Sequence, residues 1–113
     1  FIRADTVLLH TTDYKRDVNY TPCLEAKVIL EAAGLTVIEL PLAEDMVHVN
    51  FYIGSGGDVI YVPICGKAAQ DEPVLKILRG LFETVITVKT VTIFAKGGGP
   101  HCCTMQIPRA NTP

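Results

Sequence analysis

The sequence predicts an α/β protein built from two consecutive strand–helix–strand–strand units. Short β-branched, apolar segments bounded by polar turns indicate strands, and two segments with apolar residues at a spacing of three and four indicate helices. The same order of elements occurs twice, so that Thr6-Val-Leu-Leu corresponds to Asp58-Val-Ile-Tyr. The two repeat units cover about residues 5–57 and about residues 58–108, and residues 109–113 form a tail.

The first unit begins with a strand at Thr6–His10, and a polar loop follows over residues 13–20. Thr21 is a good N-cap for the first helix, and Pro22 fits its first turn, where a missing N–H costs nothing. Gly34 stands where a C-cap belongs. The apolar stripe of this helix is Leu24, Val28, Ala32 and Leu35. Strands follow at Leu35–Leu40 and Val49–Ile53, and a flexible turn at residues 54–57 ends the unit.

The second unit repeats this order from a strand at Asp58–Pro63. Asp71 is the expected cap of the second helix. Its apolar stripe is Val74, Ile77, Leu78, Leu81 and Phe82. A strand at Thr84–Val88, an apolar segment at Val91–Phe94, a glycine turn and a last strand at Pro100–Ile107 complete the unit.

Composition indicates one globular domain. The 113 residues are 49% hydrophobic and 19% charged, with a mean hydropathy of +0.32, which is too apolar for a disordered chain. The apolar runs are far shorter than the ~20 residues of a membrane helix. Net charge is −2 and basic residues are scattered, so we expect neither a membrane nor a nucleic acid as partner.

The four cysteines are Cys23, Cys65, Cys102 and Cys103. No pair has the C-x-x-C spacing of a zinc or redox site, so we expect no metal and no cofactor. Neighbouring side chains on a strand point to opposite faces, which argues against a disulfide between Cys102 and Cys103. Reduced thiols and a cytoplasmic location are the simplest interpretation.

The strongest local signal is the run Lys96-Gly-Gly-Gly-Pro-His-Cys-Cys-Thr-Met-Gln-Ile-Pro108. Glycines let the backbone approach a ligand closely, and a cysteine beside a histidine after such a turn is placed for nucleophilic chemistry. A glycine-rich hairpin followed by a strand with buried thiols explains the spacing about as well, because small buried cysteines are common.

The pattern Gly-Gly-Gly-x-His-Cys-x-Thr-x-Gln resembles the nucleophile motif of agmatine deiminases and bacterial peptidyl-arginine deiminases. Residues 49–57, Val-Asn-Phe-Tyr-Ile-Gly-Ser-Gly-Gly, are similar to a second motif of that family. Val62-Pro63, Gly66 and Asp71 are similar to its strand and acidic loop before the last helix. The resemblance implies the five-bladed pentein α/β propeller, of which the two units would be the last two blades.

The same resemblance implies that Cys102 is the nucleophile, which attacks a guanidinium carbon and expels ammonia to leave a thiouronium adduct that water resolves. It also implies that the substrate is a small guanidine or a peptidyl-arginine, and we expect Asn50, Gly98, Gly99 and His101 to bind it. Asn50 could instead cap a strand end, and adjacent strand positions diverge, which favours a structural role for His101. Cys103 falls where the family is variable. Since strand neighbours face opposite ways, we expect only Cys102 to face the site.

The sequence departs from the family in its charged partners. Members use a His-x-Asp pair and carboxylates that bind the guanidinium, but no His-x-Asp or His-x-Glu occurs here. The pair normally precedes an Arg-Phe-Ile-like strand, and Phe1-Ile-Arg3 starts a few residues later, so we expect a fragment or truncated relative that is inactive as an isolated chain. The alternative is a non-catalytic binding or scaffold module. In either case uncovered apolar faces lead us to expect a homo-oligomer.

Overall fold

The structure, a computed structural model, describes residues 1–107. The elements in chain order are β1 (Thr6–Thr11), α1 (Tyr20–Ala32), β2 (Thr36–Pro41), β3 (Tyr52–Ile53), β4 (Val59–Ile64), α2 (Ala68–Arg79), β5 (Thr84–Lys89) and α3 (Val91–Ala95). This mixed order confirms the predicted α/β class. The tail predicted for residues 109–113 lies outside the described residues. None of the helices within residues 1–107 is long and apolar enough to cross a membrane.

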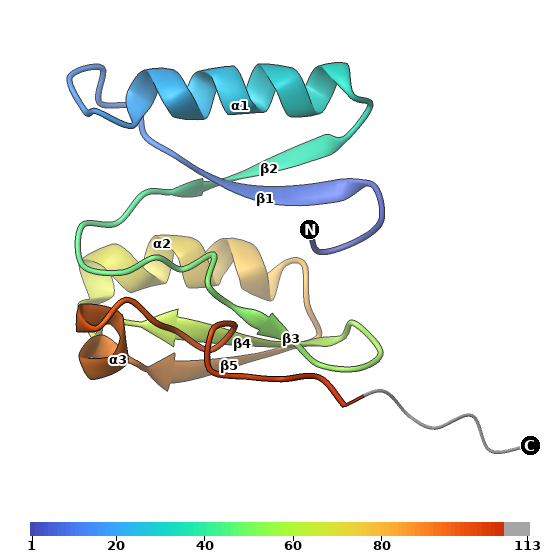
Figure 1. Ribbon diagram of the computed structural model, residues 1–113, viewed down its shortest axis with the longest axis vertical. Coiled ribbons are helices and arrows are strands. Elements are labelled where there is room, and N and C mark those ends of the chain that lie inside the picture. The colour runs from blue at the N-terminus through green and yellow to red at the C-terminus, as the bar shows by residue number, and fades with distance from the viewer. Residues whose placement is uncertain (108–113) are drawn as a thin grey trace, which may run out of the picture.

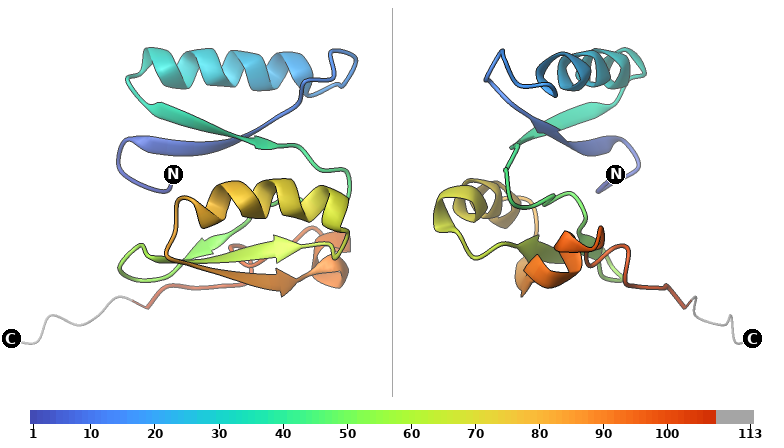
Figure 2. Two further views of the ribbon diagram at one scale, coloured as in Figure 1. Left: turned by 180° about the vertical axis from the view of Figure 1, so that it is seen from behind. Right: turned by 60° about the vertical axis from the view of Figure 1, so that its left-hand side comes forward.

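The strands form two small sheets that alternate with the two long helices. β1 and β2 are parallel, with Thr6 opposite Thr36. In the second sheet β4 is parallel to β5 and antiparallel to β3, in the order β3-β4-β5. Figures 1 and 2 show the resulting stack: α1, the first sheet, α2 and the second sheet. Both crossovers are βαβ units, whose helices must cover a sheet face.

The core lies around α2, because this helix contacts a sheet on each side. It packs against β2 of the first sheet and β5 of the second. Val74 and Leu78 on α2 and Ile60 on β4 are fully buried, as is Leu40 on β2. The apolar stripe predicted for the second helix is therefore confirmed as a core face.

The first helix differs from its prediction at its start and in its orientation. It begins at Tyr20 after Asn19, without a side-chain cap, so the prediction of Thr21 as N-cap is wrong. Gly34 follows the helix with a φ of +84°, as a C-cap glycine should. Leu24 and Val28, predicted to face the core, are more than half exposed. The helix is apolar on two sides, so the spacing alone did not say which side meets the sheet.

The strand predicted at Pro100–Ile107, after the glycine run, is absent. Residues 100–107 contain turns and irregular backbone instead of the last strand. Thr104 Oγ1 donates to the carbonyl oxygens of Pro100 and His101, and the Cys103 N–H donates to the Gly99 carbonyl. The carbonyl groups of Gly99, Pro100 and His101 are thus satisfied within the turn and not by a strand partner, and residues 101–107 are exposed.

The apolar segment Val91–Phe94 lies in α3, and the strand predicted at Val49–Ile53 is reduced to β3. This strand is predicted within the unit of residues 5–57, whereas its hydrogen bonds join it to β4, which lies in the unit of residues 58–108. The two repeat units themselves stay a prediction.

Asp71 does not cap α2, which begins at Ala68 after Lys67. The Asp71 side chain instead accepts hydrogen bonds from the N–H groups of Cys65 and Gly66, at 3.1 and 2.8 Å. It thus fixes the turn between β4 and α2. Asp71 cannot be the N-cap because α2 begins one turn before it, at Ala68.

Candidate functional site

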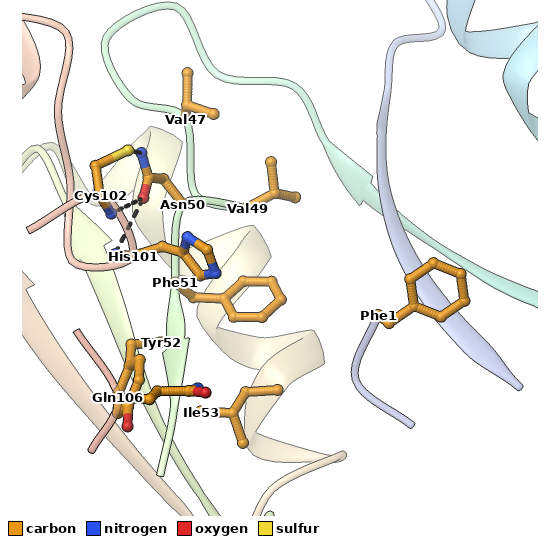
Figure 3. A pocket seen from close by; sticks show the side chains of 10 residues that line it. All are labelled: Phe1, Val47, Val49, Asn50, Phe51, Tyr52, Ile53, His101, Cys102 and Gln106. Carbon is orange, nitrogen blue, oxygen red and sulfur yellow. Dashed lines mark hydrogen bonds between the residues drawn. The ribbon is translucent and has the colours of Figure 1, made fainter. Parts of the chain in front are cut away.

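Two segments that are far apart in the sequence meet at Asn50. The Asn50 Oδ1 atom accepts hydrogen bonds from the backbone N–H groups of His101, at 3.1 Å, and Cys102, at 3.3 Å. Its Nδ2 atom lies 3.0 Å from Cys102 Sγ and donates to it. The His101 N–H also faces the Asn50 carbonyl oxygen at 3.3 Å. One carboxamide therefore holds the turn that carries Cys102 and contacts its sulfur (Figure 3).

These residues lie on the wall of an open pocket of about 480 Å³. Cys102 and His101 line it from the C-terminal turn, and Gln106 lines it further along that segment. The remaining lining residues are Phe1, Val47, Val49, Asn50, Phe51, Tyr52 and Ile53. The volume falls in the range of small-molecule sites, which are commonly about 300–1,000 Å³. Figure 3 shows the Cys102 sulfur beside the Asn50 carboxamide, with the Phe1 ring well apart from both.

The pocket has few charges. None of its lining residues within the part of the chain that the structure describes is an aspartate or a glutamate. A guanidinium in this pocket would therefore meet amide, imidazole, thiol and aromatic groups but no ion-pair partner from residues 1–107. Among these residues no group of three His, Cys, Asp or Glu side chains could hold a metal ion.

Gly99 is the glycine that the site requires. A Cβ atom at this position would lie 2.8 Å from Asn50 Cγ, so only a residue without a side chain lets the turn approach Asn50 this closely. Gly98 lies behind it, where a Cβ would come 3.0 Å from Ile93 Cγ2. Of the residues predicted for the site, Gly99, His101 and Cys102 all contact Asn50, and Gly98 packs on α3.

The remaining cysteines lie elsewhere. Cys103 is exposed and lines a different pocket, together with Tyr61 and Ile93. Cys65 is buried beside Asp71, and its Sγ lies 3.4 Å from Asp71 Oδ1. Cys23 is half-buried on α1.

Sequence reasoning did not single out Gln106, Phe51 or His48. The first two were visible within the motif runs of residues 96–108 and 49–57, which were used only for their cysteine, histidine, glycine and asparagine positions. His48 had no interpretation from the sequence. It is fully buried and its Nε2 lies 2.8 Å from Asp71 Oδ1. No sequence pattern pairs two residues that lie so far apart along the chain.

The chain is similar to known deiminases. Residues 1–108 match the family model described as Porphyromonas-type peptidyl-arginine deiminase. A Streptomyces coelicolor protein named "Putative agmatine deiminase" is 33% identical over 96% of this chain. This chain spans 37% of that relative's length.

Solved structures share the fold. The C. jejuni agmatine deiminase superposes with a TM-score of 0.77 at 22% identity, over 90% of this chain and 35% of its own. The Enterococcus faecalis agmatine deiminase gives the same TM-score at 18% identity, over 96% of this chain and 38% of its own. At these identities the likeness concerns the fold alone.

Proposed function

Because the chain belongs to the Porphyromonas-type peptidyl-arginine deiminase family, we propose that it is part of a guanidine-hydrolysing enzyme with Cys102 as the nucleophile. The observation that carries this proposal is the contact between Cys102 Sγ and Asn50 at the wall of an open pocket. A thiol that is exposed and hydrogen-bonded by a fixed amide is available for attack on a small substrate.

In the proposed reaction the Cys102 sulfur forms a bond to the guanidinium carbon. The C–N bond to one terminal nitrogen breaks, and this nitrogen leaves as ammonia after accepting a proton. Water then attacks the same carbon of the thiouronium adduct, the C–S bond breaks, and the thiol is restored beside a ureido product. The net change is one water consumed and one ammonia released per guanidine, so no oxidant or cofactor takes part. Agmatine and peptidyl-arginine are the two substrate types that the relatives' names support.

We infer that the 113-residue chain needs further residues for this reaction. A guanidinium is a permanent cation, and its recognition in a partly desolvated pocket requires an opposite charge. Acidic side chains are missing from the pocket lining within residues 1–107. The chain spans about a third of its relatives' length, so the remaining length is the natural source of these groups.

The test is a ureido-product assay with agmatine and with an arginine peptide. The 113-residue chain alone is expected to give no product. The same chain joined in frame to the coding segment that precedes it, where that segment supplies a His-x-Asp, is expected to give product. In that longer protein Cys102→Ser should abolish the reaction and Cys103→Ser, the matched control, should retain it. Activity that persists in the Cys102→Ser variant would refute the proposed nucleophile.

A second candidate function is a self-associating binding module without catalysis. The observation that favours it is the outer face of α1, where Leu24, Val28 and Ile29 are 52%, 59% and 68% exposed. A contiguous apolar face of this kind is usually covered by another surface. We infer that a second copy of the chain can cover it when no other segment does.

Sedimentation equilibrium over a range of concentrations tests this candidate. A dimer or higher oligomer that dissociates in Ile29→Glu, but not in the control Val91→Glu at an exposed apolar position on α3, would support it. A monomer at all concentrations would remove it.

Free thiols on all four cysteines support a reducing, cytoplasmic location for either function.

A further inference from the structure

A buried polar network lies next to the candidate site and is not part of the pocket lining. Its centre is the pair His48 and Asp71, which are 0% and 4% exposed. His48 Nε2 lies 2.8 Å from Asp71 Oδ1, and no partner for His48 Nδ1 occurs among the described residues. Burying such a pair costs free energy unless its geometry is favourable, and replacing it by apolar residues of similar size often leaves a protein equally stable or more stable. The pair therefore calls for an explanation other than packing.

Asp71 is fixed from three directions. Besides His48, the N–H groups of Cys65 and Gly66 donate to its carboxylate. Burial acts to raise the pKa of Asp71, but the hydrogen bonds from His48, Cys65 and Gly66 outweigh burial and lower the pKa below its usual value. The carboxylate is thus ionised at neutral pH, and it offers His48 a rigid, charged acceptor.

A second histidine holds the next residue of the same segment. His10 on β1 places Nδ1 at 3.1 Å from the Pro41 carbonyl oxygen, and its Nε2 accepts the Val49 N–H at 3.3 Å. These two partners require the neutral tautomer with the proton on Nδ1. The His10 and His48 rings lie 6.0 Å apart between centroids. Residues 48, 49 and 50 are therefore each bonded to a different part of the fold.

This anchoring matters because the segment has no ladder of strand hydrogen bonds. β3 begins only at Tyr52, so the sheet does not fix the backbone at Asn50. The Asn50 N–H instead donates to the Val47 carbonyl oxygen at 3.1 Å, and the two residues inside this turn are held by the fold, His48 by Asp71 and Val49 by His10. Asn50 then holds the N–H groups of His101 and Cys102.

We propose that His48 and Asp71 are positioning residues for the Cys102 turn, and that they act through Asn50. The inference rests on the proposed role of Cys102. It assigns a function to a buried pair that touches neither the pocket nor a substrate. His48 is a positioning residue and not a proton donor in the reaction, since its side chain is closed off from the pocket.

The test compares amide hydrogen exchange in His48→Phe and Val74→Ala. His48→Phe keeps a ring and removes the bond to Asp71, whereas Val74→Ala opens a cavity in the core of the same helix without touching the network. In His48→Phe the amides of His101 and Cys102 are expected to exchange about tenfold faster, the change expected for losing a hydrogen bond's protection. In Val74→Ala these two amides should keep their protection relative to the core amides of Ile60 and Val62.

Two conservative variants guard against a loss of folding. His48→Gln still offers an N–H toward Asp71, so the amides of His101 and Cys102 should keep most of the protection that they have in the unsubstituted chain. Asp71→Asn removes the charge, so these amides should lose protection as they do in His48→Phe. Equal effects of His48→Phe and Val74→Ala at residues 101 and 102 would overturn the proposal, as would a His48→Gln variant no better than His48→Phe. Hydrogen exchange requires no guanidine, so a failure of the deiminase assay leaves this test unaffected. If the longer protein is an active deiminase and the amides of His101 and Cys102 exchange no faster in His48→Phe, the positioning role of His48 is wrong and the proposed function stands.

Discussion

Gly99→Ala is the substitution whose effect on the site follows most directly from the geometry. The added Cβ would lie 2.8 Å from Asn50 Cγ, 3.0 Å from Nδ2 and 3.1 Å from Oδ1. Carbon atoms in comfortable contact are roughly 3.5–4.0 Å apart, so the carboxamide or the turn must move by about 0.7 Å or more. The hydrogen bonds from His101 and Cys102 to Oδ1 are already 3.1 and 3.3 Å long. A further displacement of this size breaks both.

The expected change in the free energy of unfolding combines two effects: hydrogen bonds lost in the folded state, and a smaller conformational freedom of the unfolded chain. Two lost hydrogen bonds at about 1 kcal/mol each give a loss of roughly 2 kcal/mol. Replacing glycine by alanine restricts the unfolded chain and returns about 0.4–1 kcal/mol. We expect Gly99→Ala to lower the free energy of unfolding by about 1 kcal/mol, which corresponds to a melting temperature lower by roughly 4 °C for a domain of this size.

Gly80→Ala is the matched control. Gly80 ends α2 with φ −80° and ψ −15°, a conformation open to alanine, and a Cβ there meets only the Ile77 carbonyl oxygen at 3.4 Å. The same chemical change is therefore expected to stabilise by about 0.4–1 kcal/mol. Urea unfolding followed by circular dichroism measures both variants, and hydrogen exchange at His101 and Cys102 reports the turn directly. A Gly99→Ala variant as stable as Gly80→Ala, with unchanged protection of these amides, would refute the reasoning.

Three further predictions concern the rest of the fold. Leu78→Ala should cost about 2–5 kcal/mol in urea unfolding because Leu78 is fully buried between the sheets; a cost under 1 kcal/mol would mean that α2 is not the centre of the core. Burial and the nearby His48 lower the pKa of His10 below its usual 6.5 despite its carbonyl hydrogen bonds. The unfolded state therefore binds more protons than the folded state. The free energy of unfolding should fall as the pH drops from about 7 through the lowered pKa. Thermal melts of His10→Gln should lose that part of the slope, and an unchanged slope would contradict it. Glu39→Gln removes the negative charge that pairs with Lys27 at 3.2 Å, and it should change stability by no more than about 0.5 kcal/mol in low salt.

The order of elements could be predicted from the sequence because most of it depends on local patterns. The strands at residues 6–11, 36–41, 59–64 and 84–89 are short β-branched runs, and each has a parallel partner across a helix. The second helix showed its core face because that face is a single apolar stripe. These are the cases in which spacing and burial carry the same information.

The predictions failed where side chains replace regular structure. The strand predicted at Pro100–Ile107 is absent because Thr104 and Asn50 satisfy the turn's backbone groups. The Thr21 cap is absent because the helix starts one residue before it. In α1 the sequence showed an apolar helix but not which side would be buried, since Leu24 and Val28 lie on the exposed side and Cys23 and Leu30 on the half-buried side.

The two adjacent cysteines line different pockets, but not for the reason that the sequence suggested. Alternation along a strand was the argument for only one of Cys102 and Cys103 facing the site, but residues 101–103 form a turn. The two thiols nevertheless line different pockets, because the Cys103 N–H bonds back to Gly99 while the Cys102 N–H bonds across to Asn50. The separation is thus set by Asn50 and not by strand geometry. Any change that frees Asn50 should therefore make the two thiols more alike in their accessibility to small reagents, even where the rest of the fold is unchanged.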